Sequence, residues 1–141
     1  MEIPLFQQFP ELSFAKEADK WLELVRNKTI SEQLTERKIK YILLVRLKCK
    51  GILSVTNNDY FIIQINDNDS IEEKIITLGH EISHTFETEE YRQYGISCRW
   101  PEGLCELVEK FCDAFAEKWI VVNDKEKIEL FFNEKSFAEA F

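Results

Sequence analysis

The chain contains few residues of the kinds that loosen or cross-link a fold. Of its 141 residues only 4 are glycine, 3 are proline and 4 are cysteine. This composition excludes a collagen-like chain, a low-complexity linker and a disulfide-rich scaffold. Long apolar runs are also missing, because the longest, such as residues 41–45, are far shorter than the roughly 20 residues that cross a bilayer.

The first 20 residues lack the basic start and the apolar stretch of a signal peptide. Four cysteines in such a chain indicate reduced thiols, so we expect a cytoplasmic protein. Positive charge is scarce as well, since 18 Lys and Arg stand against 26 Asp and Glu, for a net charge of −8. A nucleic-acid-binding surface needs basic patches, and we expect the basic stretch from Arg37 to Lys50 to be a solvated face. These observations predict no membrane association and no direct contact with nucleic acid.

Apolar residues are plentiful, at 45% of the chain, and they support one domain over residues 1–141. Pro4 and Pro10 predict an extended entry. Hydrophobic spacing predicts helices over residues 13–27 and 31–40 and helices that begin at Ser70, Pro101 and Glu126. It predicts strands over residues 41–49, 52–55 and 60–65, the last two forming a hairpin, and an irregular segment over residues 88–99. For residues 41–49 a continuation of the preceding helix is the competing interpretation. The expected fold class is α+β, with a short antiparallel sheet packed beside the helices.

The only two histidines lie four residues apart in a predicted helix, in the sequence HEISH at residues 80–84. Residues i and i+4 share one helix face, so His80 and His84 can bind one Zn²⁺ together. Glu81 lies at the flank of that face, where it can take a proton from an attacking water and return it to a leaving amine. The competing interpretation is a surface helix with two solvated histidines.

A catalytic zinc site needs a third protein ligand, and the chain has no third histidine. The helix after Pro101 offers four acidic side chains on one flank, namely Glu102, Glu106, Glu109 and Asp113. Glu109 lies closest to the apolar face of that helix, and Asp113 can accept the second ring N–H of a ligand histidine. Spacing alone does not separate Glu109 from Glu106, and a solvated acidic face is the simpler explanation of such a stripe.

Three of the cysteines, Cys98, Cys105 and Cys112, are spaced by seven residues, and no Cys-x-x-Cys pair occurs. This pattern favours core packing of the thiols. If Cys105 or Cys112 supplied a fourth ligand, the open position would be closed and the zinc would be structural.

The order of a hairpin, a capped helix with HEISH and a later helix with EKFCDAFA at residues 109–116 resembles the ImmA/IrrE-type metallopeptidases, which are gluzincin-like. The resemblance covers roughly residues 41–122. Typical members carry His-Glu-[Leu/Ile]-Gly-His and Glu-x-x-Cys-Asn-x-Phe-Ala motifs. The resemblance implies a zincin-like domain in which His80, His84 and Glu109 bind Zn²⁺, Glu81 is the general base and Asp113 supports a ligand histidine.

The chain departs from the family pattern at several positions. Gly79 stands where the family usually has Ala, Ser83 replaces a Gly, and Asp113 replaces an Asn. Residues 119–122 stand where the family often has a Phe-Leu-x-Pro ending, and the proline is missing, which concerns the chain path after the helix and not the metal site.

The resemblance also implies a function, that of a zinc-dependent metallo-endopeptidase. Its expected substrate is a separate helix-turn-helix repressor protein of a phage, a mobile element or a stress regulon. The alternative is a zinc-binding module that does not cleave, such as an antirepressor or a toxin–antitoxin component that acts by binding.

Peptide hydrolysis also needs a donor for the developing oxyanion, and the segment between the two metal-binding helices offers Tyr91, Arg92, Tyr94 and Arg99. Surface residues are the simpler interpretation of these four. Residues 60–65 can serve as a sheet edge to which an extended substrate adds as a further strand.

Overall fold

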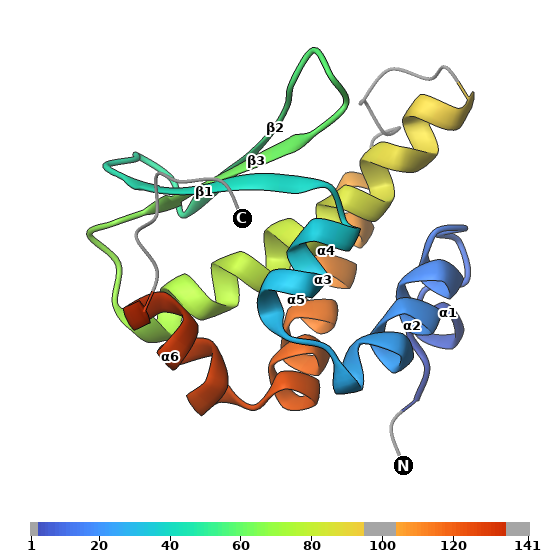
Figure 1. The fold of residues 1–141 in the computed structure, drawn as a ribbon. Coiled ribbons are helices and arrows are strands. Elements are labelled where there is room, and N and C mark those ends of the chain that lie inside the picture. The colour runs from blue at the N-terminus through green and yellow to red at the C-terminus, as the bar shows by residue number, and fades with distance from the viewer. Residues whose placement is uncertain (1–2, 95–103, 135–141) are drawn as a thin grey trace.

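A computed structural model describes residues 3–94 and 104–134. The protein is α+β, with a small sheet on one side and the helices gathered on the other (Figure 1). In chain order the elements are α1 (Leu5–Gln8), α2 (Ala15–Leu24), the 3₁₀ helix η1 (Val25–Asn27), α3 (Ile30–Glu36), β1 (Ile39–Val45), β2 (Gly51–Val55), β3 (Phe61–Asn66), α4 (Ile71–Tyr94), α5 (Leu104–Asn123) and α6 (Lys125–Glu134).

The sheet is mixed, which corrects the expected antiparallel arrangement. Its strand order is β1-β3-β2, with the predicted β2–β3 hairpin antiparallel and β1 parallel to β3. The strand expected to be an edge, residues 60–65, therefore lies at the centre. The reason is its apolar content, because Phe61, Ile63 and Ile65 are completely buried, whereas β2 is mostly exposed. The edges of the sheet are β1 and β2.

Local signals explain where several helices begin. A capping box starts α3, since the Thr29 hydroxyl accepts from the Glu32 N–H and the Glu32 carboxylate accepts from the Thr29 N–H. The predicted cap of α4 is confirmed, because the Ser70 hydroxyl accepts from the Glu73 N–H at 3.2 Å. The prediction that the first residues are extended is wrong, because they form the short helix α1. The backbone N–H groups of Leu5 and Phe6, at the start of this helix, donate to the Asp19 carboxylate.

The helix α4 is longer than expected, since it continues into the segment predicted to be irregular and reaches Tyr94. Residues 95–99 of that segment lie outside the described residues. The buried Arg37 supports this extension. Its guanidinium donates to Thr85 at 2.9 Å and to Glu89 at 3.1 Å, and it lies 3.7 Å from the centre of the Phe86 ring. These contacts join two segments that are far apart in the sequence, so local hydrophobic spacing does not report them.

The helices α4 and α5 pack together at the centre of the core. Most apolar residues at helical spacing are buried there, namely Ile75, Leu78, Ile82 and Phe86 of α4 and Val108, Phe111, Phe115 and Trp119 of α5, whereas Ile71 at the start of α4 is exposed. Gly79 sets the spacing of the two helices, because a Cβ atom at this position would lie 3.0 Å from the Cα of Ala116 and 3.1 Å from the Trp119 ring.

We expect Gly79→Ala to lower the free energy of unfolding by roughly 1–2 kcal/mol. Overpacking costs about 1–3 kcal/mol, and the higher helix propensity of alanine offsets up to about 1 kcal/mol of it. Urea unfolding of the variant measures the change, and Glu117→Ala, on the exposed face of α5, is the matched surface control. A gain in stability for Gly79→Ala would show that the two helices do not approach as closely as described.

Candidate metal centre

The candidate site lies between α4 and α5, at the place where Gly79 allows the two helices to approach. The histidine-bearing stretch of α4 contributes His80, Glu81 and His84. The helix α5 contributes Glu109 and Asp113 from the turns that face it. Ligand candidates that are distant in the sequence thus meet because the two apolar faces pack together.

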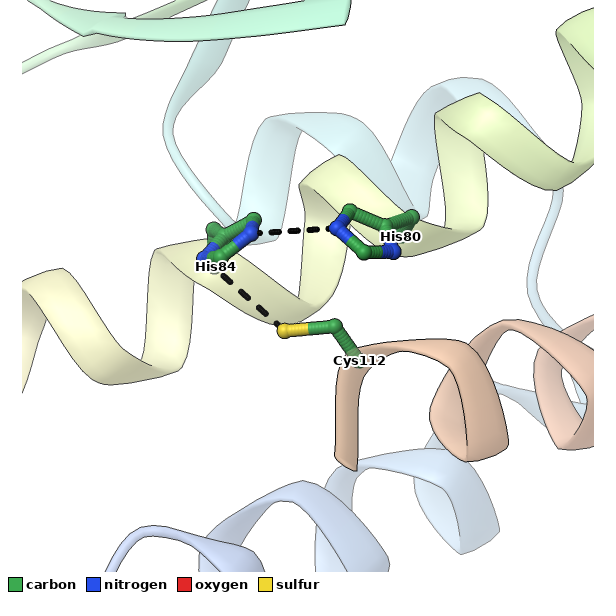
Figure 2. A group of neighbouring side chains, drawn as sticks. All are labelled: His80, His84 and Cys112. Carbon is green, nitrogen blue, oxygen red and sulfur yellow. Dashed lines mark hydrogen bonds between the residues drawn. The ribbon is translucent and has the colours of Figure 1, made fainter. Parts of the chain in front are cut away.

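Both histidines turn the same ring atom toward the same point. The two Nε2 atoms lie 3.2 Å apart (Figure 2). The carboxylate of Glu109 lies against both of them, with one oxygen 2.9 Å from Nε2 of His80 and the other 3.5 Å from Nε2 of His84. Ligands at about 2.0–2.1 Å from a tetrahedral zinc ion are separated by roughly 3.3 Å, so these three side chains already have the spacing of a metal site.

Each histidine is held at its other ring nitrogen by a carboxylate. Nδ1 of His80 lies 2.9 Å from Asp113, which is the contact predicted for that residue, and Nδ1 of His84 lies 2.7 Å from Glu87. If each Nδ1 carries the proton of these hydrogen bonds, each neutral ring directs its Nε2 lone pair at the other and at Glu109. Such a cluster of lone pairs and negative charge attracts a cation.

The pKa shifts of two residues in the cluster also favour the binding of a cation. Burial by itself lowers the pKa of His84, but hydrogen bonds with Cys112, Glu109 and Glu87 raise that pKa far above its ordinary value. The hydrogen bond from His84 lowers the pKa of the Glu109 carboxyl. The groups around His84 therefore favour positive charge at this position, which a bound metal cation would supply.

Glu81 is buried on the sheet side of the same helix. The residue is 6% exposed, and burial raises the pKa of its carboxyl. It lies against Gly51, where a Cβ atom would be 3.3 Å from Cγ of Glu81 and only 2.6 Å from Thr77. A pocket of about 190 Å³ opens beside it, lined by Lys50, Gly51, Ile76, Thr77, His80, Glu81 and Asp113. This pocket connects the buried carboxyl with one of the two histidines.

Cys112 provides a second set of donors. His80, His84 and Cys112 each offer one ligand atom, and these atoms lie within 4.8 Å of one another, so the group could hold a metal ion. The thiol sulfur, however, lies 3.8 Å from Nδ1 of His84, whereas the other ring nitrogen, Nε2, is the one that faces His80 (Figure 2). Burial also raises the pKa of this thiol, which favours the protonated form over the thiolate that binds metals. The geometry therefore favours Glu109 as the third donor.

The sequence predictions have different outcomes at this site. The structure brings His80, His84, Glu109 and Asp113 together. All three of Glu106, Glu109 and Asp113 are exposed, but of these three only Glu109 and Asp113 contact a histidine within the part of the chain that the structure describes. Core packing is confirmed for Cys112 and wrong for Cys105, which is exposed, while Cys98 lies outside the described residues.

The proposed oxyanion donors cannot be placed. Arg99 lies outside the described residues, and so do the side chains of Tyr91, Arg92 and Tyr94, whose backbone belongs to α4. Sequence reasoning missed Glu87. The available signal was its position three residues after His84, which is the spacing of neighbours on a helix face.

We expect Asp113→Ala to weaken zinc binding by roughly 10–100-fold, the usual effect of removing a partner that orients a ligand histidine. Asp113→Asn should lose less, because the amide oxygen can still accept the Nδ1 proton of His80. Competition titration against a chelating dye measures both affinities. Equal affinity of the alanine variant and the wild type would exclude an orienting role for Asp113.

Comparisons with known proteins add no relative to this picture. No family model matches the chain, and neither curated proteins nor solved structures show a significant similarity to it. Within the described ranges 3–94 and 104–134, none of the helices combines the length and the apolar character that a membrane crossing requires.

Proposed function

We propose that the protein is a zinc-dependent endopeptidase with a zincin-like fold, of the ImmA/IrrE type, which acts in the cytoplasm. The observation that carries the proposal is that the Nε2 atoms of His80 and His84 both lie against the Glu109 carboxylate. The buried Glu81 lies next to them, on the helix that carries the two histidines. A structural site needs the ligands alone, whereas a hydrolase also needs a proton acceptor beside them.

Each residue has a defined role in this proposal. His80, His84 and Glu109 hold the ion, and Asp113 orients His80. A zinc ion bound there supplies Lewis-acid chemistry, which polarises a carbonyl group and makes water more acidic. Glu81 accepts the proton of the attacking water and transfers it to the departing amine.

The surroundings of Glu81 suit proton transfer in both directions. Burial raises the pKa of its carboxyl toward the working pH, where one group can accept and then release a proton. Lys50 lines the same pocket and adds a positive charge to it. The pocket thus joins an acid–base group, a ligand histidine and a cation in one small volume.

The proposed substrate is a separate transcriptional repressor of the helix-turn-helix type. The net charge of −8 favours approach of a basic DNA-binding protein and disfavours direct binding of nucleic acid. The charge supports this class of partner through long-range attraction, and it does not select one member of the class.

The test is cleavage of purified helix-turn-helix proteins from the same genome by the zinc-loaded protein. New termini are identified by mass spectrometry, and reactions with a chelator, and with zinc restored afterwards, are run in parallel. Cleavage that stops with the chelator and returns with zinc is the expected result.

The same assay separates the alternative. A stable complex with a repressor that stays intact, although zinc is bound, would contradict the endopeptidase and favour an antirepressor that acts by binding. A protein that does not take up zinc at all would exclude both.

A further inference from the structure

Two side chains meet His84 at its Nδ1 atom, whereas its Nε2 atom faces His80. The Glu87 carboxylate lies 2.7 Å from Nδ1 and the Cys112 sulfur lies 3.8 Å from it. Glu87 comes from the next turn of α4, and its side chain is 13% exposed, while Cys112 is completely buried on α5. His84 therefore belongs to two possible ligand sets. One is completed by the Glu109 carboxylate and the other by the Cys112 sulfur.

The two sets use His84 in different ways. When Nδ1 carries a proton for Glu87, the metal-binding lone pair is on Nε2, which faces His80 and Glu109. When Nδ1 is free of that proton, its lone pair lies next to the Cys112 sulfur. An imidazole–carboxylate set leaves an open position for a hydrolytic zinc, whereas a thiolate favours softer metals and closed sites.

We propose that Glu87 is a positioning residue that determines metal specificity: by holding the Nδ1 proton of His84 it commits Nε2 to the His80–His84–Glu109 set and excludes Cys112 from ligation. The proposal rests on the proposed metal site, although it does not depend on peptide hydrolysis.

The two orienting carboxylates are not equivalent, which supports this assignment. Asp113 reaches His80 from the other helix, and its side chain is 72% exposed. Glu87 belongs to the same helix as His84 and is largely shielded from water. A charge-assisted hydrogen bond that is short and shielded holds a ring more firmly than an exposed one. Glu87 also contacts Nδ1 of His84, the ring nitrogen that lies 3.8 Å from the Cys112 sulfur.

The test uses Co²⁺ as the probe, because thiolate ligation gives a sulfur-to-cobalt charge-transfer band in the near ultraviolet. Wild-type protein, Glu87→Leu, Glu87→Gln and Glu87→Leu combined with Cys112→Ser are titrated with Co²⁺ and with Zn²⁺. We expect no such band in the wild type, a band in Glu87→Leu, and its loss in the double variant. Zinc affinity should fall roughly 10–100-fold in Glu87→Leu and recover in Glu87→Gln, which keeps an acceptor for the Nδ1 proton.

Circular dichroism and thermal unfolding establish that each variant is folded, and Glu87→Ala replaces the leucine variant if the latter does not fold. A charge-transfer band in the wild type would overturn the proposal, and so would a Glu87→Leu variant with wild-type affinity and no band. If the wild type binds neither metal, the proposed metal site itself fails, and this result is distinguishable because it appears before any substitution.

Discussion

Glu109→Ala is expected to remove stoichiometric zinc from the purified protein, while Glu106→Ala keeps one zinc per chain. Glu109 contacts both Nε2 atoms, at 2.9 and 3.5 Å, and Glu106 is an exposed carboxylate one turn earlier on the same helix. The pair therefore has matched charge and helix context, and only the contact with the histidines differs. Elemental analysis after dialysis against zinc-free buffer measures the content, and the loss of affinity should exceed the roughly 10–100-fold of an orienting residue.

Cys112→Ser completes this comparison because it removes the competing donor. We expect this variant to keep its zinc, since the sulfur lies on the Nδ1 side of His84. Loss of zinc in Cys112→Ser together with its retention in Glu109→Ala would assign the site to His80, His84 and Cys112. That result would contradict the three-ligand set proposed above.

Glu81→Gln is expected to lower the rate of repressor cleavage by about 10²–10⁴-fold without lowering the zinc content, because it removes a general base and leaves the ligands in place. Rate constants under saturating substrate and elemental analysis of the same sample give the two values. Unchanged turnover would exclude Glu81 as the proton acceptor.

The same variant should be at least as stable as the wild type. Burial raises the pKa of Glu81 in the folded state, so at pH values above its unfolded pKa the ionised carboxyl costs folding free energy. Glutamine has nearly the same shape and carries no charge, and it removes that cost. Thermal unfolding at neutral pH measures the difference, and a marked loss of stability would show that Glu81 is a structural residue.

The parts of the site that follow from sequence are those set by helix geometry. The four-residue spacing of His80 and His84 and the position of Glu81 are local, and the predicted α4 carries them as expected. The choice between Glu109 and Glu106 depends on how α5 is rotated against α4, and spacing along one helix does not contain that information. Glu87 was missed because a glutamate three residues after a histidine is common on exposed helices.

The fold shows the same division between local and distant contacts. The β2–β3 hairpin and the cap at Ser70 are short-range features and were predicted. The parallel pairing of β1 with β3 joins residues such as Ile39 and Phe61, which are separated by the whole of β2. The short helix α1 depends on Asp19, which lies in the following helix. Which of these distant contacts form depends on how the whole chain buries its apolar residues, and a local stretch of sequence does not contain that information.

If the proposed site binds zinc, the division of the donors between α4 and α5 makes the stability of the folded protein depend on its metal supply. An ion that bridges these helices binds the folded state and not the unfolded one, and at a free concentration of 100 times Kd it adds about 2.7 kcal/mol to the free energy of unfolding. Because these two helices form the centre of the core, their separation is coupled to global unfolding. In a cell short of the metal, proteases would meet more of the unfolded chain, so abundance and activity would decline together.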